Sequence, residues 1–128
     1  MYEEYEGYPV ASCEKSWQRL LADENIDVVR NEEDWNRSFD CGKPSRHPLA
    51  KSSGREIAEF TKSLVFNNGG LAHANYRSLR NSLTLSGFDR LGAMFGISPI
   101  LMADYNNMKC SARATCSTSI TDICTSNC

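Results

Sequence analysis

Residues Cys110 to Cys128 read CSARATCSTSITDICTSNC, and we expect the rest of the chain to be organised around them. Four of the six cysteines lie here at spacing C-x5-C-x7-C-x3-C, with eight Ser or Thr residues between them. Only Ile120 and Ile123 are large aliphatic residues, so the stretch buries too little apolar surface to offset the entropy lost on ordering. We therefore predict that sulfur chemistry gives this tail its shape.

Several kinds of cross-link are open to these cysteines. Two disulfides among Cys110, Cys116, Cys124 and Cys128 allow three pairings, between which the spacing does not choose. Each bond would contribute roughly 2–4 kcal/mol to stability. A structural zinc site normally uses C-x2-C knuckles, which these spacings do not match, so we expect no metal ligand and no cofactor. Two further candidates for cross-linking lie nearer the start of the chain, at Cys13 and Cys41.

Hydroxyl residues precede the tail cysteines at short range: Ser111 or Thr115 before Cys116, Thr121 before Cys124, and Thr125 before Cys128. In this the tail resembles the core of a lanthipeptide precursor, a bacteriocin-type antimicrobial peptide. In that family Ser and Thr are dehydrated, and the thiolate of a downstream Cys closes a thioether ring. The resemblance implies modifying enzymes as partners and an export transporter that cuts after a double glycine, here Gly69 and Gly70.

The charge of the chain is unevenly distributed. Residues 1–50 carry 6 Lys or Arg against 11 Asp or Glu, while residues 51–128 carry 8 against 5. No run of five like charges occurs, so both halves are expected to be ordinary solvated surface. The acidic start has no apolar stretch typical of a signal peptide, and no apolar run is long enough to span a membrane. Because six cysteines favour an oxidising compartment, secretion by a non-classical or dedicated route is expected, with the cytoplasm as the alternative.

Residues 1–40 are predicted to form an acidic segment with one or two short helices. Residues 1–11 are expected to be an arm, and helices are predicted at about 12–22 and 32–39. Two prolines with Gly, Ser and charged residues mark 41–53 as a linker, in which His47 is expected to be exposed.

Residues 54–108 are predicted to form a helical core, and residues 109–128 an irregular tail. Ser53 and Glu56 form a capping box that opens a helix to about Val65, and 67–70 is expected to end it. Further helices are predicted at about 71–83 and, as a pair, within 86–108. The predicted fold is therefore mostly α: a small bundle of three or four short helices at about 53–108.

Phe88 to Asn107, FDRLGAMFGISPILMADYNN, resembles the helix-turn-helix of repressor-type DNA-binding domains through its apolar positions and the turn at Gly96. Its second helix offers no basic or amide side chain before Asn106, so a nucleic-acid partner is not expected. His47 and His73 lie in no recognisable pairing with a nucleophile, so the chain is not expected to be an enzyme.

Two functions follow as hypotheses. The first is a secreted, bacteriocin-like effector or its precursor, with the active part in the cross-linked C-terminus. The alternative is a small helical binding module with a tail held by disulfides or zinc. Such a module would bind DNA through its helix-turn-helix-like part, or it would bind a partner protein, as immunity proteins do. Its protein partner would be a basic target that docks on the acidic first half.

Overall fold

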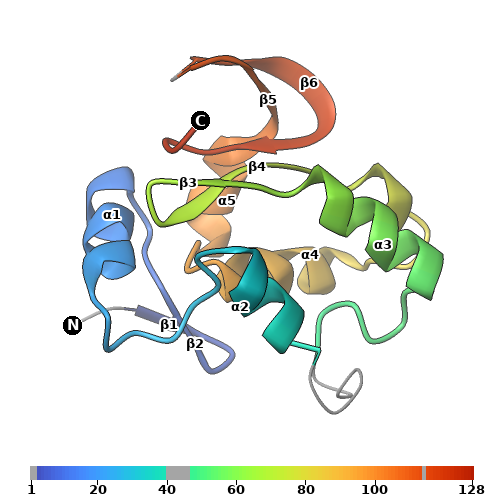
Figure 1. The fold of residues 1–128 in the computed structure, drawn as a ribbon, viewed down its shortest axis with the longest axis horizontal. Coiled ribbons are helices and arrows are strands. Elements are labelled where there is room, and N and C mark those ends of the chain that lie inside the picture. Colours follow the sequence, from blue (N-terminus) through green and yellow to red (C-terminus); the bar gives the residue numbers. More distant parts are fainter. Residues whose placement is uncertain (1–2, 40–46, 114) are drawn as a thin grey trace.

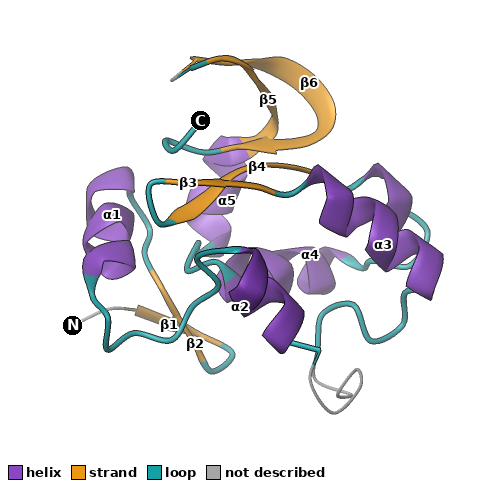
Figure 2. Cartoon of the chain, viewed as in Figure 1, coloured by secondary structure: helices purple, strands orange, loops and turns teal. Residues whose placement is uncertain are grey.

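A computed structural model describes residues 3–39, 47–113 and 115–128 (Figure 1). The prediction of a mostly helical bundle is wrong. The described residues combine helices with two antiparallel sheets, one of two strands and one of four, and so form a mixed α/β fold (Figure 2).

The helices of the described chain begin close to where the sequence predicts them. Their bounds are α1 (Glu14–Ala22), α2 (Glu32–Arg37), α3 (Gly54–Ser63), α4 (Leu85–Met94) and α5 (Pro99–Tyr105), with a 3-10 turn η1 (Arg77–Leu79). The capping box is confirmed: the Ser53 hydroxyl accepts from the Glu56 amide, and the Glu56 carboxylate accepts from the Ser53 amide. Ser98 likewise caps α5 by accepting from the Leu101 amide.

The strands are the part that the sequence prediction missed. Their bounds are β1 (Glu3–Tyr5), β2 (Tyr8–Val10), β3 (Val65–Asn67), β4 (Gly70–Asn75), β5 (Asn106–Ala112) and β6 (Thr115–Cys124). The predicted helix at 71–83 is instead β4 followed by η1. Asn68 and Gly69 have φ of 54° and 80°, the pair of positive values that a tight hairpin turn requires. The residues expected to stop a helix therefore reverse the chain between two strands.

The two ends of the chain were also predicted to be irregular, and both form strands. The expected N-terminal arm is the β1–β2 hairpin, which turns at Glu6 and Gly7 with φ of 47° and 89°. The expected irregular tail supplies half of the four-stranded sheet, whose order is β3-β4-β6-β5. In the view of Figure 1 the β5–β6 hairpin arches beyond β3 and β4, on the opposite side from α2 and β1–β2.

The core lies between the sheet and the helices and is centred on aromatic rings. Trp35 of α2 is fully buried, stacks on Phe95 at a centroid distance of 5.7 Å, and meets Phe60 of α3 edge to face. Trp17 of α1 donates its indole N–H to the Phe95 carbonyl at 3.0 Å. Ile123 of β6 is 1% exposed, so the C-terminal strand is part of this core.

The described part of the predicted linker also packs inward. Leu49 is fully buried, and His47, expected to be exposed, is only 5% exposed. The His47 ring stacks on Phe39, and its Nδ1 accepts from the Leu49 amide at 3.0 Å. Its Nε2 lies 3.2 Å from the Ser38 hydroxyl, so apolar contact and hydrogen-bond partners for both ring nitrogens account for its burial. Cys41, a predicted cross-link candidate, lies outside the described residues.

Candidate functional site

The candidate site is the clamped hairpin, defined here as residues 106–128, which contains both disulfides of the described chain. Cys110 is bonded to Cys128, with Cα atoms 5.7 Å apart, and Cys116 to Cys124, with Cα atoms 5.9 Å apart. The structure thus contains the disulfides that were one of the alternatives left open by the sequence. Cys13 is a free, exposed thiol at the start of α1, and its hydrogen bond with Ser16 lowers its pKa.

The disulfide pairing closes the hairpin on itself. Cys116 and Cys124 lie at the two ends of β6, and eight residues of straight strand would span roughly 26 Å. A Cα distance of 5.9 Å therefore requires β6 to curve back, and Thr121 bends it with a φ of 62°. Cys110 lies directly opposite Cys116 in the β5–β6 ladder. The Sγ atoms of Cys110, Cys124 and Cys128 all lie within 4.8 Å of one another, so the two bonds form one sulfur cluster.

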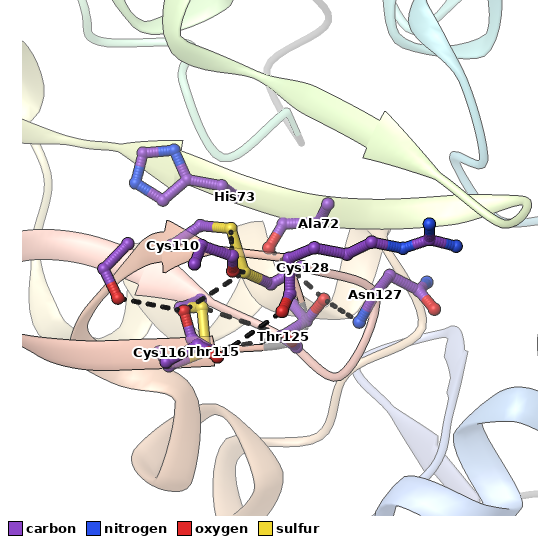
Figure 3. Close-up of a disulfide and its surroundings, with 12 residues drawn as sticks. Ala72, His73, Cys110, Thr115, Cys116, Thr125, Asn127 and Cys128 are labelled. Carbon is purple, nitrogen blue, oxygen red and sulfur yellow. Dashed lines mark hydrogen bonds between the residues drawn. A yellow bond between two sulfur atoms is a disulfide. The ribbon is translucent and has the colours of Figure 1, made fainter.

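Thr125 fixes the inner side of this hairpin to the body of the protein. It is 1% exposed, and its amide donates to the Ala72 carbonyl of β4 at 3.0 Å. Its hydroxyl donates to the Leu71 carbonyl at 2.5 Å and accepts from the Asn127 amide at 3.0 Å. Figure 3 shows Thr125 and Asn127 beside the Cys110–Cys128 bond, with Ala72 on the neighbouring strand. Three main-chain groups are satisfied by this one residue.

A buried carboxylate makes a second connection between β4 and β6. Asp122 accepts from Asn75 at 2.9 Å and from Ser119 at 2.6 Å, and it lies 3.0 Å from His73 Nε2. Burial by itself raises the pKa of Asp122. The hydrogen bonds from Ser119 and Asn75, together with the charge and hydrogen bond of His73, outweigh that effect and hold the pKa below its ordinary value. The ionised carboxylate is thus the stable form in the fold.

The outer face of the clamped hairpin is exposed and carries positive charge and hydroxyl groups. The exposed residues in the described part of the hairpin are Asn107, Lys109, Cys110, Ser111, Ala112, Arg113, Thr115, Thr118 and Ile120. Ile120 is a large apolar side chain that is 67% exposed. The hairpin is therefore anchored on one face, clamped by sulfur, and open to solvent on the other.

The predicted thioether acceptors lie in different environments. Ser111 and Thr115 are exposed, and the Ser111 hydroxyl donates to the Thr115 carbonyl at 3.3 Å. Thr121 and Thr125 are 7% and 1% exposed. In this form all four tail sulfurs are used in disulfides, which leaves no tail thiol to close a thioether ring. Thioether formation stays a prediction, to be tested by mass.

The predicted processing site lies at the β3–β4 turn. Gly69 is at the exposed tip, whereas Gly70 is buried, and a Cβ built on Gly70 would lie 2.5 Å from a Leu21 methyl group. A cut after Gly70 would separate β3 from β4 and divide the sheet. In the folded chain, such a cut would disrupt the body that holds the C-terminus.

The segment that resembles a helix-turn-helix does contain two helices, α4 and α5. α5 turns Leu101 and Met102 into the core and leaves Ile100, Ala103 and Asp104 exposed. An exposed face of this composition offers no donor to base edges or phosphates.

Apart from the clamped hairpin, the described residues also form a groove. It has a volume of about 840 Å³ and lies between the β1–β2 hairpin and α2, with Val28, Val29 and Met94 among its apolar lining. Its charged lining residues are Glu6, Asp27, Asp34 and Arg37. Glu6 pairs with Arg90 at 3.6 Å and Asp34 pairs with Arg37. Three carboxylates against one guanidinium make the lining acidic, and Asp27 is its exposed carboxylate outside these two ion pairs.

Sequence reasoning missed the cluster around Asp122 and this groove. Asp122 and His73 are 49 positions apart and meet only because β4 pairs with β6. The hairpin signal at Asn68 and Gly69 was the local clue that could have placed His73 on a strand.

Comparisons with protein-family models, curated proteins and solved structures give no match to this chain. Among the described residues, no helix has both the length and the apolar character that crossing a bilayer requires. The two disulfides indicate an oxidising environment.

We predict that removing either disulfide weakens the fold. From sequence separations of 18 and 8, Cys110→Ser/Cys128→Ser should lower the free energy of unfolding by about 3 kcal/mol and Cys116→Ser/Cys124→Ser by about 2.5 kcal/mol. Urea unfolding measures both. Cys13→Ser is the control and should stay within about 0.5 kcal/mol of the parent, because Cys13 is exposed and unbonded. If the free energy of unfolding of either double variant falls no more than that of Cys13→Ser, the disulfides do not stabilise the hairpin as predicted.

We predict that Asp122 makes the fold sensitive to acid. Because its folded pKa is depressed, its contribution is complete above its unfolded pKa of about 4 and is lost as the pH falls through the folded value. Asp122→Asn should therefore be less stable at neutral pH and should lose less further stability on acidification. Asp104→Asn, at an exposed position on α5, is the control. Unfolding midpoints from neutral pH to about pH 3 test this, and parallel curves for Asp122→Asn and the parent would refute it.

Proposed function

We propose that the chain is a secreted, bacteriocin-like effector that acts as an intact folded domain and binds its target through the outer face of the clamped hairpin. The observation that carries the proposal is that both described disulfides converge on one hairpin whose outer face is exposed. Cross-links that fix an exposed loop reduce the entropy lost when that loop binds a partner.

The anchoring of the hairpin supports action by the whole domain and not by a released tail. Ile123, Cys124 and Thr125 are each 1% exposed. Release of the C-terminus would expose these residues and break the bonds from Thr125 to β4. The mixed α/β body and the hairpin therefore form one functional unit in this proposal.

The chemistry of the outer face indicates the kind of target. Lys109 and Arg113 supply positive charge, and Ile120 supplies an apolar side chain that is 67% exposed. Such a surface suits an anionic target on a cell surface that also has an apolar region.

A binding and growth-inhibition assay on a panel of bacterial strains tests the proposal with the full chain. Lys109→Ala/Arg113→Ala should weaken cell-surface binding at least about tenfold, since two charged contacts are lost. Arg55→Ala/Lys62→Ala removes the same charge from exposed positions on α3 and should bind like the parent. Reduced and alkylated protein should lose binding. Equal binding by the two double variants would refute the hairpin as the contact surface.

The acidic groove favours a second candidate function, binding of a basic protein in the manner of an immunity protein. Asp27 is exposed at its rim and has no hydrogen bond or ion pair among the described residues. Asp27→Lys should leave hairpin-dependent binding unchanged. If Asp27→Lys abolishes target binding while Lys109→Ala/Arg113→Ala does not, the groove is the functional surface.

A further inference from the structure

The sulfur cluster has the dimensions of a metal site once its bonds are opened. The Sγ atoms of Cys110, Cys124 and Cys128 lie within 4.8 Å of one another. A zinc ion with four thiolates at about 2.3 Å keeps its sulfurs about 3.8 Å apart. Cys116 lies outside this group of three, but it is bonded to Cys124 and lies opposite Cys110 in the ladder, so a short shift of its side chain after the bonds open would bring in the fourth sulfur.

We propose that, after reduction, the four cysteines of the clamped hairpin form one four-thiolate site for zinc or another thiophilic divalent cation. Each disulfide accepts two electrons and two protons from a dithiol protein or from two low-molecular-weight thiols, which become a disulfide. The four thiols that result give up four protons as the cation binds. The proposal stands independently of the proposed function, since it concerns the chain in a reducing compartment.

The fold supports the site because main-chain bonds hold the cysteines without the disulfides. Cys124 pairs with His73 of β4, and Cys110 pairs with Cys116 of β6. The Cys128 amide donates to the Thr125 carbonyl at 3.1 Å, and Thr125 is itself bonded to Ala72. Breaking the two sulfur–sulfur bonds leaves these contacts available to keep the thiols together.

Access and charge are also suitable for a cation bound by thiolates. Cys110 is exposed, whereas Cys124 and Cys128 are 1% and 9% exposed, so the cluster is open on one side and enclosed on the other. Four thiolates and one divalent cation leave a net charge of −2. Lys109 and Arg113 are exposed cations within three residues of Cys110, where they partly compensate that charge.

The spacing alone could not indicate this site. Zinc knuckles place two ligands on one tight turn, whereas C-x5-C-x7-C-x3-C has no such pair. The site arises because β6 curves back between Cys116 and Cys124 and the chain end returns to Cys110.

Cobalt titration of the reduced full chain tests the proposal. The Cys13→Ser/Cys41→Ser chain, reduced with a phosphine under anaerobic conditions, retains only the four tail thiols. It should bind one Co²⁺, giving the visible absorption of tetrahedral cobalt with four thiolates, and Zn²⁺ should displace the cobalt. Adding Cys116→Ser should weaken Zn²⁺ binding by more than about tenfold, because loss of even an outer-shell partner costs that much. Thr118→Ala, at an exposed position on the same strand, is the control.

Amide hydrogen exchange shows whether the metal is held by the fold or by an unfolded tail. In the metal-bound reduced chain, the Thr125 and Tyr76 amides, which donate to Ala72 and Thr121, should stay protected. Octahedral cobalt spectra, unchanged binding in Cys116→Ser, or metal binding without this protection would each overturn the proposal.

Discussion

The main-chain pairing of β6 with β4 joins the C-terminal segment to the body of the protein. It places Ile123 in the core and Asp122 beside His73 and Asn75. Thr125 extends the same contact by satisfying the Leu71 and Ala72 carbonyls. Main-chain hydrogen bonds to β4 thereby fix the buried part of the polar C-terminal segment. The disulfides restrict the rest of it, the curved and exposed part of the hairpin.

Two kinds of stabilisation are therefore separated in space along one short segment. Residues 121–125 are stabilised by burial and by hydrogen bonds to β4. The described residues of 108–118 pair with each other in the β5–β6 ladder and are mostly exposed, so the two disulfides restrict the shape of this part beyond what its own main-chain bonds do. A disulfide restricts the unfolded chain irrespective of apolar burial, which suits a hairpin without a core of its own. This division is what makes the outer face a rigid candidate surface.

The sequence allowed the helices to be predicted because their signals are local. The capping box at Ser53 and Glu56, and the Ser98–Pro99 start of α5, depend on residues within one turn. The strands depend on partners far along the chain, and β4 was mistaken for a helix because its Ala and Leu residues suit both structures.

The involvement of the tail cysteines in cross-links could be predicted from their density. Their pairing could not, because it follows from the curvature of β6 at Thr121. The prediction that the tail buries too little apolar surface to offset its ordering did not foresee that Ile123 packs into the core, where it is 1% exposed.

Disulfide mapping of the native protein, by proteolysis without reduction and mass spectrometry, determines whether the two disulfides close the C-terminal hairpin. We expect linked peptides joining Cys110 to Cys128 and Cys116 to Cys124, with Cys13 free, and an intact mass that rises by about 2 Da per bond on reduction. A Cys110–Cys116 link, unbonded tail thiols, or a mass lower by about 18 Da for each dehydrated Ser or Thr would contradict it.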